Sequence, residues 1–157
     1  MRLIVVVLAL LMPCLTMAQS PADSVDVRLD DHRWEHRLLF VFVPANAADA
    51  RAEQEDEFEG HDAGFRDRDL RLFTLTGPDR GTLRTEPGAE PRPLTVAAVE
   101  RIYDRFGVPA DAFRVVLVGK DGTEKRRNAE PVTARSVFDT IDAMPMRQRE
   151  MREADDD

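Results

Sequence analysis

The chain has 157 residues, of which 33% are charged, and a formal net charge of −8. A chain of this length can bury one real core but is too short for two ordinary domains. The acidic balance argues against a uniform binder of nucleic acids or anionic membranes, both of which require the opposite charge. A single cysteine excludes an internal disulfide.

Residues 1–18 have the pattern of a signal peptide. A basic residue precedes Leu3–Met12, an uncharged apolar run, and the segment TMA then supplies small residues at the positions that signal peptidase reads. The run is too short to span a bilayer, so a membrane anchor is a weaker alternative, as is a lipid anchor on Cys14. We therefore expect cleavage after Ala18 and a secreted, periplasmic protein. Its mature chain would begin at Gln19, without cysteine and without an integral membrane segment.

Apolar runs and helical patterns alternate along the rest of the chain. Leu38–Val43 is a continuous apolar run, typical of a strand buried on both faces. Thr95 and Thr133 can each cap a helix, and an apolar residue precedes each cap. Asp121-Gly122 is the strongest hairpin signal in the chain. In chain order we expect a strand over 38–43, a helix over 47–59, a strand over 70–75, an irregular connection over 77–93, a helix over 95–106, strands over 113–118 and 123–127, and a helix from 133 to 144.

This order, β-α-β and then α-β-β-α, predicts an α/β, thioredoxin-like domain with a mixed sheet and helices on both faces. We expect the domain over residues 34–144. An N-terminal extension over 19–33 precedes it, and a charged C-terminal tail over 145–157 follows it. The polar strand over 123–127 would lie at the edge of the sheet, where basic side chains discourage pairing with other chains.

Three segments, RWEHRLLFVFVPA, RFGVPADAFRVVLVGKDG and IDAMPMRQREMR, together resemble a domain-of-unknown-function family of short secreted bacterial proteins. The domain of that family also occurs in vertebrate extracellular matrix proteins, including sushi-repeat-containing ones. The resemblance covers residues 34–152, and its most specific part is the motif DAMPMRxREM. The family is distantly similar to peroxiredoxins and has no established catalytic residues. The resemblance therefore implies a fold and no active site.

The chain lacks the thiol that redox enzymes of this fold use. Thioredoxins place Cys-x-x-Cys after the first strand, which falls here near Ala47 and Ala50. Peroxiredoxins use Pro-x-x-x-Thr-x-x-Cys, and Pro44 fits that proline, but Ala48 replaces the threonine and Arg51 the cysteine. Neither alanine nor arginine can supply a thiolate. We therefore expect no thiol oxidoreductase or peroxidase activity, and no cofactor.

A zinc hydrolase is the third hypothesis for function. His32, Glu35 and His36 match H-x-x-E-H, a zinc-peptidase motif whose histidines must share one helical face. No substantial helix is expected there, and in a strand the same spacing would separate the histidines by about 13 Å. The simpler interpretation is that Trp34 packs in the core beside solvated histidines.

The leading hypothesis is a non-catalytic binding module of the bacterial cell envelope, whose partner is an unknown protein or an acidic envelope component and not a nucleic acid. Its predicted contact residues are the basic residues of the hairpin and the C-terminal segment: Lys125, Arg126, Arg127, Arg147, Arg149 and Arg152. The second hypothesis is a Cu(I) binder that uses the soft thioethers of Met144, Met146 and Met151, although Met144 also fits the core stripe of the last helix. Pro145 should end that helix after Met144.

Overall fold

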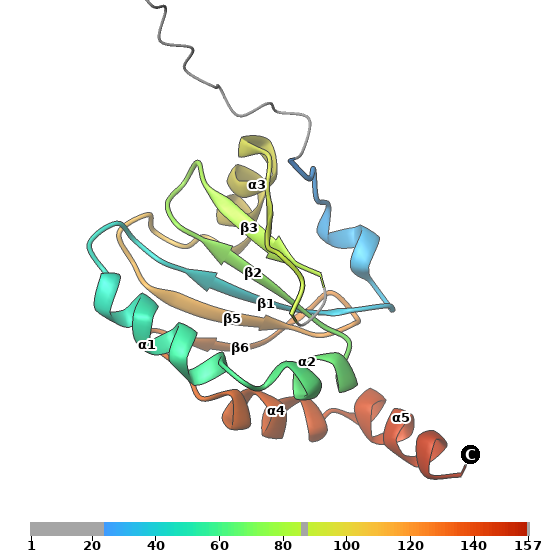
Figure 1. Cartoon of the computed structure of the whole chain (residues 1–157). Coiled ribbons are helices and arrows are strands. Elements are labelled where there is room, and N and C mark those ends of the chain that lie inside the picture. Colours follow the sequence, from blue (N-terminus) through green and yellow to red (C-terminus); the bar gives the residue numbers. More distant parts are fainter. Residues whose placement is uncertain (1–23, 86–87, 157) are drawn as a thin grey trace, which may run out of the picture.

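The computed structural model describes residues 24–85 and 88–156, so the predicted signal peptide, its cleavage site and Cys14 lie outside the described residues (Figure 1). The strands are β1 (Arg37–Phe42), β2 (Leu70–Leu75), β3 (Gly81–Arg84), β4 (Arg92–Pro93), β5 (Arg114–Val118) and β6 (Glu124–Asn128). The helices are α1 (Ala48–Phe58), α2 (Asp62–Asp67), α3 (Val96–Phe106), α4 (Ala134–Asp142) and α5 (Pro145–Asp155), preceded by a short 3-10 helix, η2 (Leu29–His32). None of the helices within the described ranges is long and apolar enough to cross a membrane.

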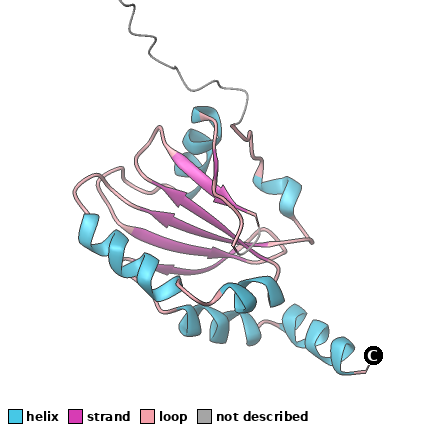
Figure 2. Ribbon diagram, in the orientation of Figure 1, coloured by secondary structure: helices cyan, strands magenta, loops and turns pink. Residues whose placement is uncertain are grey.

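The strands form one mixed sheet in the order β4-β3-β2-β1-β5-β6, with helices on both of its faces (Figure 2). Strand β1 is parallel to β2 and antiparallel to β5. All six residues of β1 are buried, and the five that follow Arg37 form an unbroken apolar run that lets both faces of the strand pack against a helical layer. The polar strand β6 lies at one edge, as predicted. The structure thus confirms the predicted fold class.

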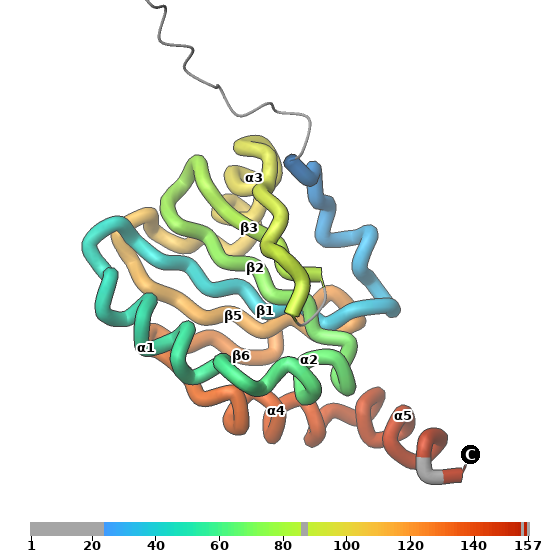
Figure 3. The backbone as a smooth tube through the Cα atoms, viewed as in Figure 1, coloured from blue at the N-terminus to red at the C-terminus, as the bar shows by residue number. Residues whose placement is uncertain are grey.

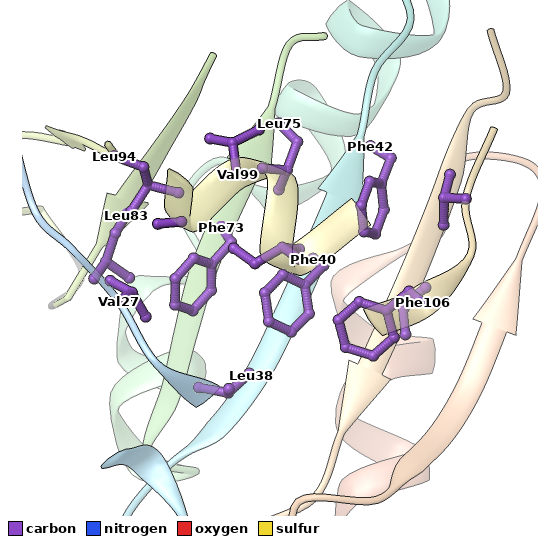
Figure 4. Close-up of a cluster of buried hydrophobic side chains, with 14 of the residues drawn as sticks. Val27, Leu38, Phe40, Phe42, Phe73, Leu75, Leu83, Leu94, Val99 and Phe106 are labelled. Carbon is purple, nitrogen blue, oxygen red and sulfur yellow. The ribbon is translucent and has the colours of Figure 1, made fainter. Parts of the chain in front are cut away.

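Helix α3 covers one face of the sheet and builds an aromatic core there (Figure 4). The rings of Phe40 and Phe73 stack with their centroids 4.7 Å apart, and the ring of Phe106 from α3 lies 4.9 Å from that of Phe40. Val27, from the segment before β1, closes the same cluster. Complete burial of each such side chain contributes about 1.5–3 kcal/mol to folding.

Helices α1, α2 and α4 lie on the opposite side of the sheet from α3 (Figure 3). Phe58 from α1, Phe65 from α2 and Ile141 from α4 pack there against the alternate residues of the central strands, such as Leu39 and Leu117. Successive side chains of a strand point to opposite faces, so Val116 belongs to the α3 cluster and its neighbour Leu117 to this one.

Two threonines begin helices as the sequence predicts. The side chain of Thr95 accepts a hydrogen bond from the backbone N–H of Ala98 at 3.2 Å, and that of Thr133 accepts one from Ser136 at 3.1 Å. Each satisfies an N–H group that has no partner within its helix. At the other end of α3, Gly107 adopts φ 57°, a left-handed conformation that glycine tolerates without a steric penalty. The predicted starts of both helices are confirmed.

Two expectations about regular structure were incomplete. The connection over 77–93, predicted to be irregular, contains β3 and β4, because its short alternating segment GTLR pairs with β2 and buries every second residue. The expected tail over 145–157 contains helix α5. Pro145 occupies the first turn of that helix, where its missing N–H costs nothing, and Met144 before it is extended. Helix α4 ends at Asp142, earlier than Met144.

The prediction that Trp34 plugs the core is wrong. Its side chain is 62% exposed, and its backbone has φ 70° in a turn between η2 and β1. The backbone N–H of Trp34 donates to the carbonyl of Lys120 at 2.6 Å, which holds this turn against the β5–β6 hairpin.

Candidate ligand-binding groove

The end of β1 carries no reactive side chain where redox enzymes of this fold hold their thiol. Helix α1 begins at Ala48 with Ala47 at its N-cap, and no side chain caps it. Arg51, at the position matched to the peroxidase cysteine, pairs with Glu55 at 2.8 Å. These residues can donate hydrogen bonds and balance charge, but they cannot act as thiol nucleophiles.

A groove with a volume of about 500 Å³ lies at the opposite end of the sheet, between the β5–β6 turn and the junction of α4 and α5. Its apolar lining comes from the junction: Ala143, Met144, Pro145 and Met146. Its cationic lining comes from Arg37 at the start of β1, from Lys120 and Lys125 on the hairpin and from Arg149 on α5. Residues far apart in the sequence therefore form one surface that combines apolar contact with positive charge.

The four cations of this groove differ in how far nearby carboxylates already neutralise them. The Lys120 ammonium lies 2.8 Å from carboxylate oxygens of both Asp69 and Glu150, and that of Lys125 lies 2.6 Å from Asp121. Partial burial tends to raise the pKa of Asp121, but hydrogen bonds from Lys125 and from nearby residues outweigh it, and the pKa is lowered. Arg149 is exposed and makes no ion pair with any residue in the described part of the chain.

Buried ion pairs hold α5 beneath the sheet. The Arg37 side chain is 1% exposed, and it donates to both carboxylate oxygens of Glu150 at 3.1 Å and to the carbonyl of Arg68 at 2.9 Å. Burial tends to raise the pKa of Glu150, but Lys120 and Arg37 outweigh it, so the pKa is lowered and the carboxylate stays charged. Arg37 could not be buried at this position without that partner.

A second set of ion pairs fixes the start of α5. The Arg68 guanidinium lies 2.5 Å from the carboxylate of Asp142. Arg147, which is 8% exposed, pairs with Asp142 at 3.3 Å and with Asp67. Burial tends to raise the pKa of Asp142, but the two arginines outweigh it, and the pKa is lowered. Asp142, Arg147 and Glu150 all belong to the motif DAMPMRQREM, so three of its four charged positions have a structural role, and Arg149 is the exception.

The predicted basic contact residues therefore separate into different environments. Lys125 and Arg149 line the groove, whereas Arg152 is exposed further along α5. Arg126 donates to the carbonyl of Ser136 at 2.8 Å, Arg127 pairs with Glu124 at 2.7 Å and donates to the carbonyl of Phe106, and Arg147 belongs to the buried ion pairs. The structure brings together only part of the predicted set.

The three methionines do not converge. Met144 and Met146 both line the groove, and Met144 also packs against the core, so two thioethers at most share this surface. Met151 follows Met146 by five positions on α5, which places the two side chains about 140° apart around the helix. A Cu(I) site needs its thioethers directed at one point, so this arrangement gives the copper hypothesis no support.

The histidines lie closer together than a strand would allow. The turn after η2 brings Nδ1 of His32 within 3.5 Å of Nδ1 of His36, and Nη2 of Arg71 lies 2.9 Å from Nε2 of His36. Arginine only donates, so Nε2 of His36 must accept, and its Nδ1 carries the proton that points to His32. Burial and, after it, neighbouring positive charge lower the pKa of both histidines.

The expectation of a wide spacing was therefore wrong, because it assumed a strand. The zinc hypothesis nevertheless gains no support, since Arg71 places a cation beside the pair. Moreover, no group of three or more histidine, cysteine, aspartate or glutamate residues within 24–85 and 88–156 could hold a metal ion.

Fold and site together define an α/β, thioredoxin-like domain that lacks the redox thiol. Residues 28–150 match the family model described as "Domain of unknown function (DUF4174)", and the chain belongs to this family. It is 26% identical, over 156 residues, to "Coiled-coil domain-containing protein 80" of Danio rerio, a match that covers 86% of this chain and 18% of that protein. It therefore spans less than a fifth of that relative.

The fold resembles that of a reduced 2-Cys peroxiredoxin from Plasmodium vivax, with a TM-score of 0.55 and 14% sequence identity. That similarity covers 78% of this chain and 85% of the peroxiredoxin. At this identity the likeness establishes the thioredoxin-like fold and nothing about chemistry.

Sequence reasoning missed the residues that neutralise the basic side chains. Arg37 borders a fully buried strand, and its position beside an apolar run was the available signal that it needs a carboxylate partner. Glu150 lies in the specific C-terminal motif, but nothing in the sequence spacing links it to Arg37. Their contact spans 113 positions and depends on the complete fold.

Proposed function

We propose that this protein is a non-catalytic binding module of the bacterial cell envelope, which acts after secretion. Its binding site is the groove between the β5–β6 turn and the α4–α5 junction, and the ligand is an acidic segment of a partner that also carries an apolar group. The observation that carries the proposal is Arg149, an exposed guanidinium without an ionic partner among the described residues, beside the apolar lining of this groove.

The groove combines two properties that favour such a ligand. Its volume of about 500 Å³ lies within the range of small-ligand sites. Lys120 and Lys125 already have carboxylate partners and contribute hydrogen bonds more than net charge, whereas Arg149 is free to pair with a carboxylate. Met144 and Met146 can adapt their shape to an apolar group.

A catalytic role for the groove has little support. Its one hydroxyl, that of Thr140, donates to the carbonyl of Ser136 at 2.9 Å and accepts from Arg126. No histidine lies among the lining residues to activate it. A hydroxyl nucleophile needs an adjacent general base, so the groove fits recognition and not turnover.

Site-specific photo-crosslinking in secreting cells tests the proposal. A photoreactive phenylalanine analogue at Met146 should form an ultraviolet-dependent adduct with an envelope component, and Arg149→Glu should suppress that adduct. The matched control position is Arg66, which is exposed on α2 away from the groove. Adducts that form equally at both positions, or that persist in the Arg149→Glu variant, would contradict the proposed site.

The cellular compartment of the protein requires a separate measurement. Osmotic-shock fractionation followed by N-terminal sequencing should find the protein in the periplasmic fraction, beginning at Gln19. A protein that retains Met1, or that carries lipid on Cys14, would contradict the proposed route of secretion.

A further inference from the structure

A second and larger groove, of about 640 Å³, lies between α1 and the neighbouring strands β2 and β3. Its floor contains two cross-strand pairs, Leu72 opposite Arg84 and Thr74 opposite Thr82. Residues at alternate positions of a strand share a face, so all four side chains project toward the groove. They are half-buried.

The composition of this floor differs from that of the covered part of the same sheet face. Where α1, α2 and α4 cover it, the sheet presents apolar residues such as Leu39, Val41 and Leu117. On β3 it presents a hydroxyl and a guanidinium instead. A surface prepared for another helix would be apolar, so the floor of this groove is better suited to a polar ligand.

Arg84 is the residue that indicates the charge of this ligand. Its guanidinium lines the groove and forms no ion pair with any residue in the described part of the chain, and its Nε is buried without a partner, as is the Nε of the ion-paired Arg37. Buried donors in proteins are nearly always satisfied. A guanidinium pairs best with a carboxylate, which it binds through two parallel hydrogen bonds. A carboxylate bound in the groove would give Arg84 an ionic partner.

The opposite wall limits the ligand to a single negative charge. Arg51 is already paired with Glu55, and Gln54 exchanges two hydrogen bonds with the backbone of Val132. Asp56, Glu59 and, at the start of α2, Asp62 also line the groove. These carboxylates would repel a polyanion, and they can accept hydrogen bonds from an ammonium group.

We propose that this groove binds a short peptide with free termini, whose C-terminal carboxylate pairs with Arg84. The hydroxyls of Thr74 and Thr82 are placed to hydrogen-bond the peptide backbone, and the α1 carboxylates face its ammonium group. The site is distinct from the groove beside Arg149, and neither proposal depends on the other.

Calorimetric titration of the purified mature protein with trialanine tests this site. The matched ligands are trialanine amide, which lacks the carboxylate, and N-acetyl-trialanine, which lacks the ammonium. Because charged hydrogen bonds are among the stronger ones, trialanine amide should bind about tenfold or more weakly than trialanine. N-acetyl-trialanine should lose less affinity than trialanine amide does, since the α1 carboxylates that face the ammonium group are exposed to solvent.

Variants at Arg84 test whether this residue binds the C-terminal carboxylate of the peptide. Arg84→Leu should bind trialanine and its amide equally weakly, whereas Arg80→Leu, a change at an exposed arginine outside the groove, should bind like the parent protein. If Arg84→Leu does not fold, Arg84→Lys should fold and retain only part of the preference for the free carboxylate, because a lysine cannot form the bidentate pair.

Several outcomes would overturn the proposal: no heat of binding with trialanine, equal affinity of the parent protein for the amide, or an unchanged preference in the Arg84 variants. Binding of acetate alone as tightly as trialanine would also overturn it, since the site would then recognise an isolated anion. Crosslinking at Met146 should be unaffected by Arg84→Leu, so failure of either proposal can be recognised without the other.

Discussion

Arg147 and Arg149 lie two residues apart on α5 and have opposite environments. Arg147 is 8% exposed and reaches carboxylates of α2, α4 and α5, whereas Arg149 is exposed at the rim of a groove and pairs with none of the described residues. A similar contrast separates Arg37, whose guanidinium pairs with Glu150, from Arg84, whose guanidinium pairs with no carboxylate in the described part of the chain. The comparison shows that residue type and position in the sequence do not determine which arginines are neutralised. The ion pairs that each one forms within the fold do.

The largest expected loss of stability comes from substitutions in the central sheet, whose strand order sets where these arginines lie. Val116 and Leu117 point into opposite core layers. Replacing either one with aspartate should prevent folding, because an unpaired buried charge costs several kcal/mol against a total stability of about 5–15 kcal/mol. Circular dichroism and thermal melting provide the measurement. A soluble variant with near-normal cooperative melting would contradict the strand order and the contrast built on it.

The next largest loss of stability is expected at Arg147, which is buried, unlike Arg149. Arg147→Glu should lower the free energy of unfolding by about 2–4 kcal/mol, because it places a third carboxylate beside Asp67 and Asp142. We expect less than for a fully buried pair, since Asp67 is half exposed. Urea denaturation measures the change, and Arg66→Glu on the surface of α2 is the control. A loss below the control value would mean that Arg147 is as free as Arg149.

The pH dependence of stability distinguishes the ion-paired region from the histidine turn. The pKa values of Asp142 and Glu150 are lowered in the folded protein, so their contribution is present at neutral pH and is lost as pH falls below the unfolded values of 3.8 and 4.5. The pKa values of His32 and His36 are also lowered in the folded protein, so protonation of these histidines favours the unfolded chain. Stability should therefore also fall as pH drops below 6.5.

Urea midpoints measured from about pH 7.5 to pH 3 should therefore decline in two stages. His32→Gln combined with His36→Gln should flatten the upper stage, and Asp142→Asn should lower stability at neutral pH while weakening the lower stage. Stability that rises on acidification between about pH 7 and pH 5 would contradict the environment described for the histidines.

The smallest expected effect on stability belongs to the exposed arginine. Arg149→Glu should change the free energy of unfolding by no more than about 0.5 kcal/mol, as is usual for a surface substitution, while it removes capture of the acidic partner. Chemical denaturation and the crosslinking assay measure the two effects separately. A large loss of stability would place Arg149 among the structural ion pairs and remove the main support for the proposed function.

The methionines supply a separate check on metal binding. Replacing Met144, Met146 and Met151 with leucine should cost less than about 1.5 kcal/mol at each site, because leucine conserves volume. Elemental analysis of protein purified without a histidine tag measures its copper. If the parent protein binds Cu(I) and the leucine variant does not, the copper hypothesis would replace the proposed binding role.

Much of the fold followed from the sequence alone. The buried run over 38–43, the caps Thr95 and Thr133 and the Asp121-Gly122 turn each depend on neighbours within about four positions, and the structure confirms the elements that they predict. The missing thiol could also be read directly, since an absent side chain needs no tertiary context. Strand β3 was hidden because its four residues lie within a segment rich in glycine and proline.

Only the tertiary structure decided which charged residues are free. Arg37 and Glu150 meet across 113 positions, and Arg68 and Asp142 meet across 74, so no local pattern could predict either pair. The histidines approach because the chain turns before β1, and Lys125 and Met146 line one groove because β6 folds back beside α4. Periodicity and capping are set by nearby residues. The partner of a charge is set by which distant segments the core packs together, and in this protein that determines which arginines remain available for binding.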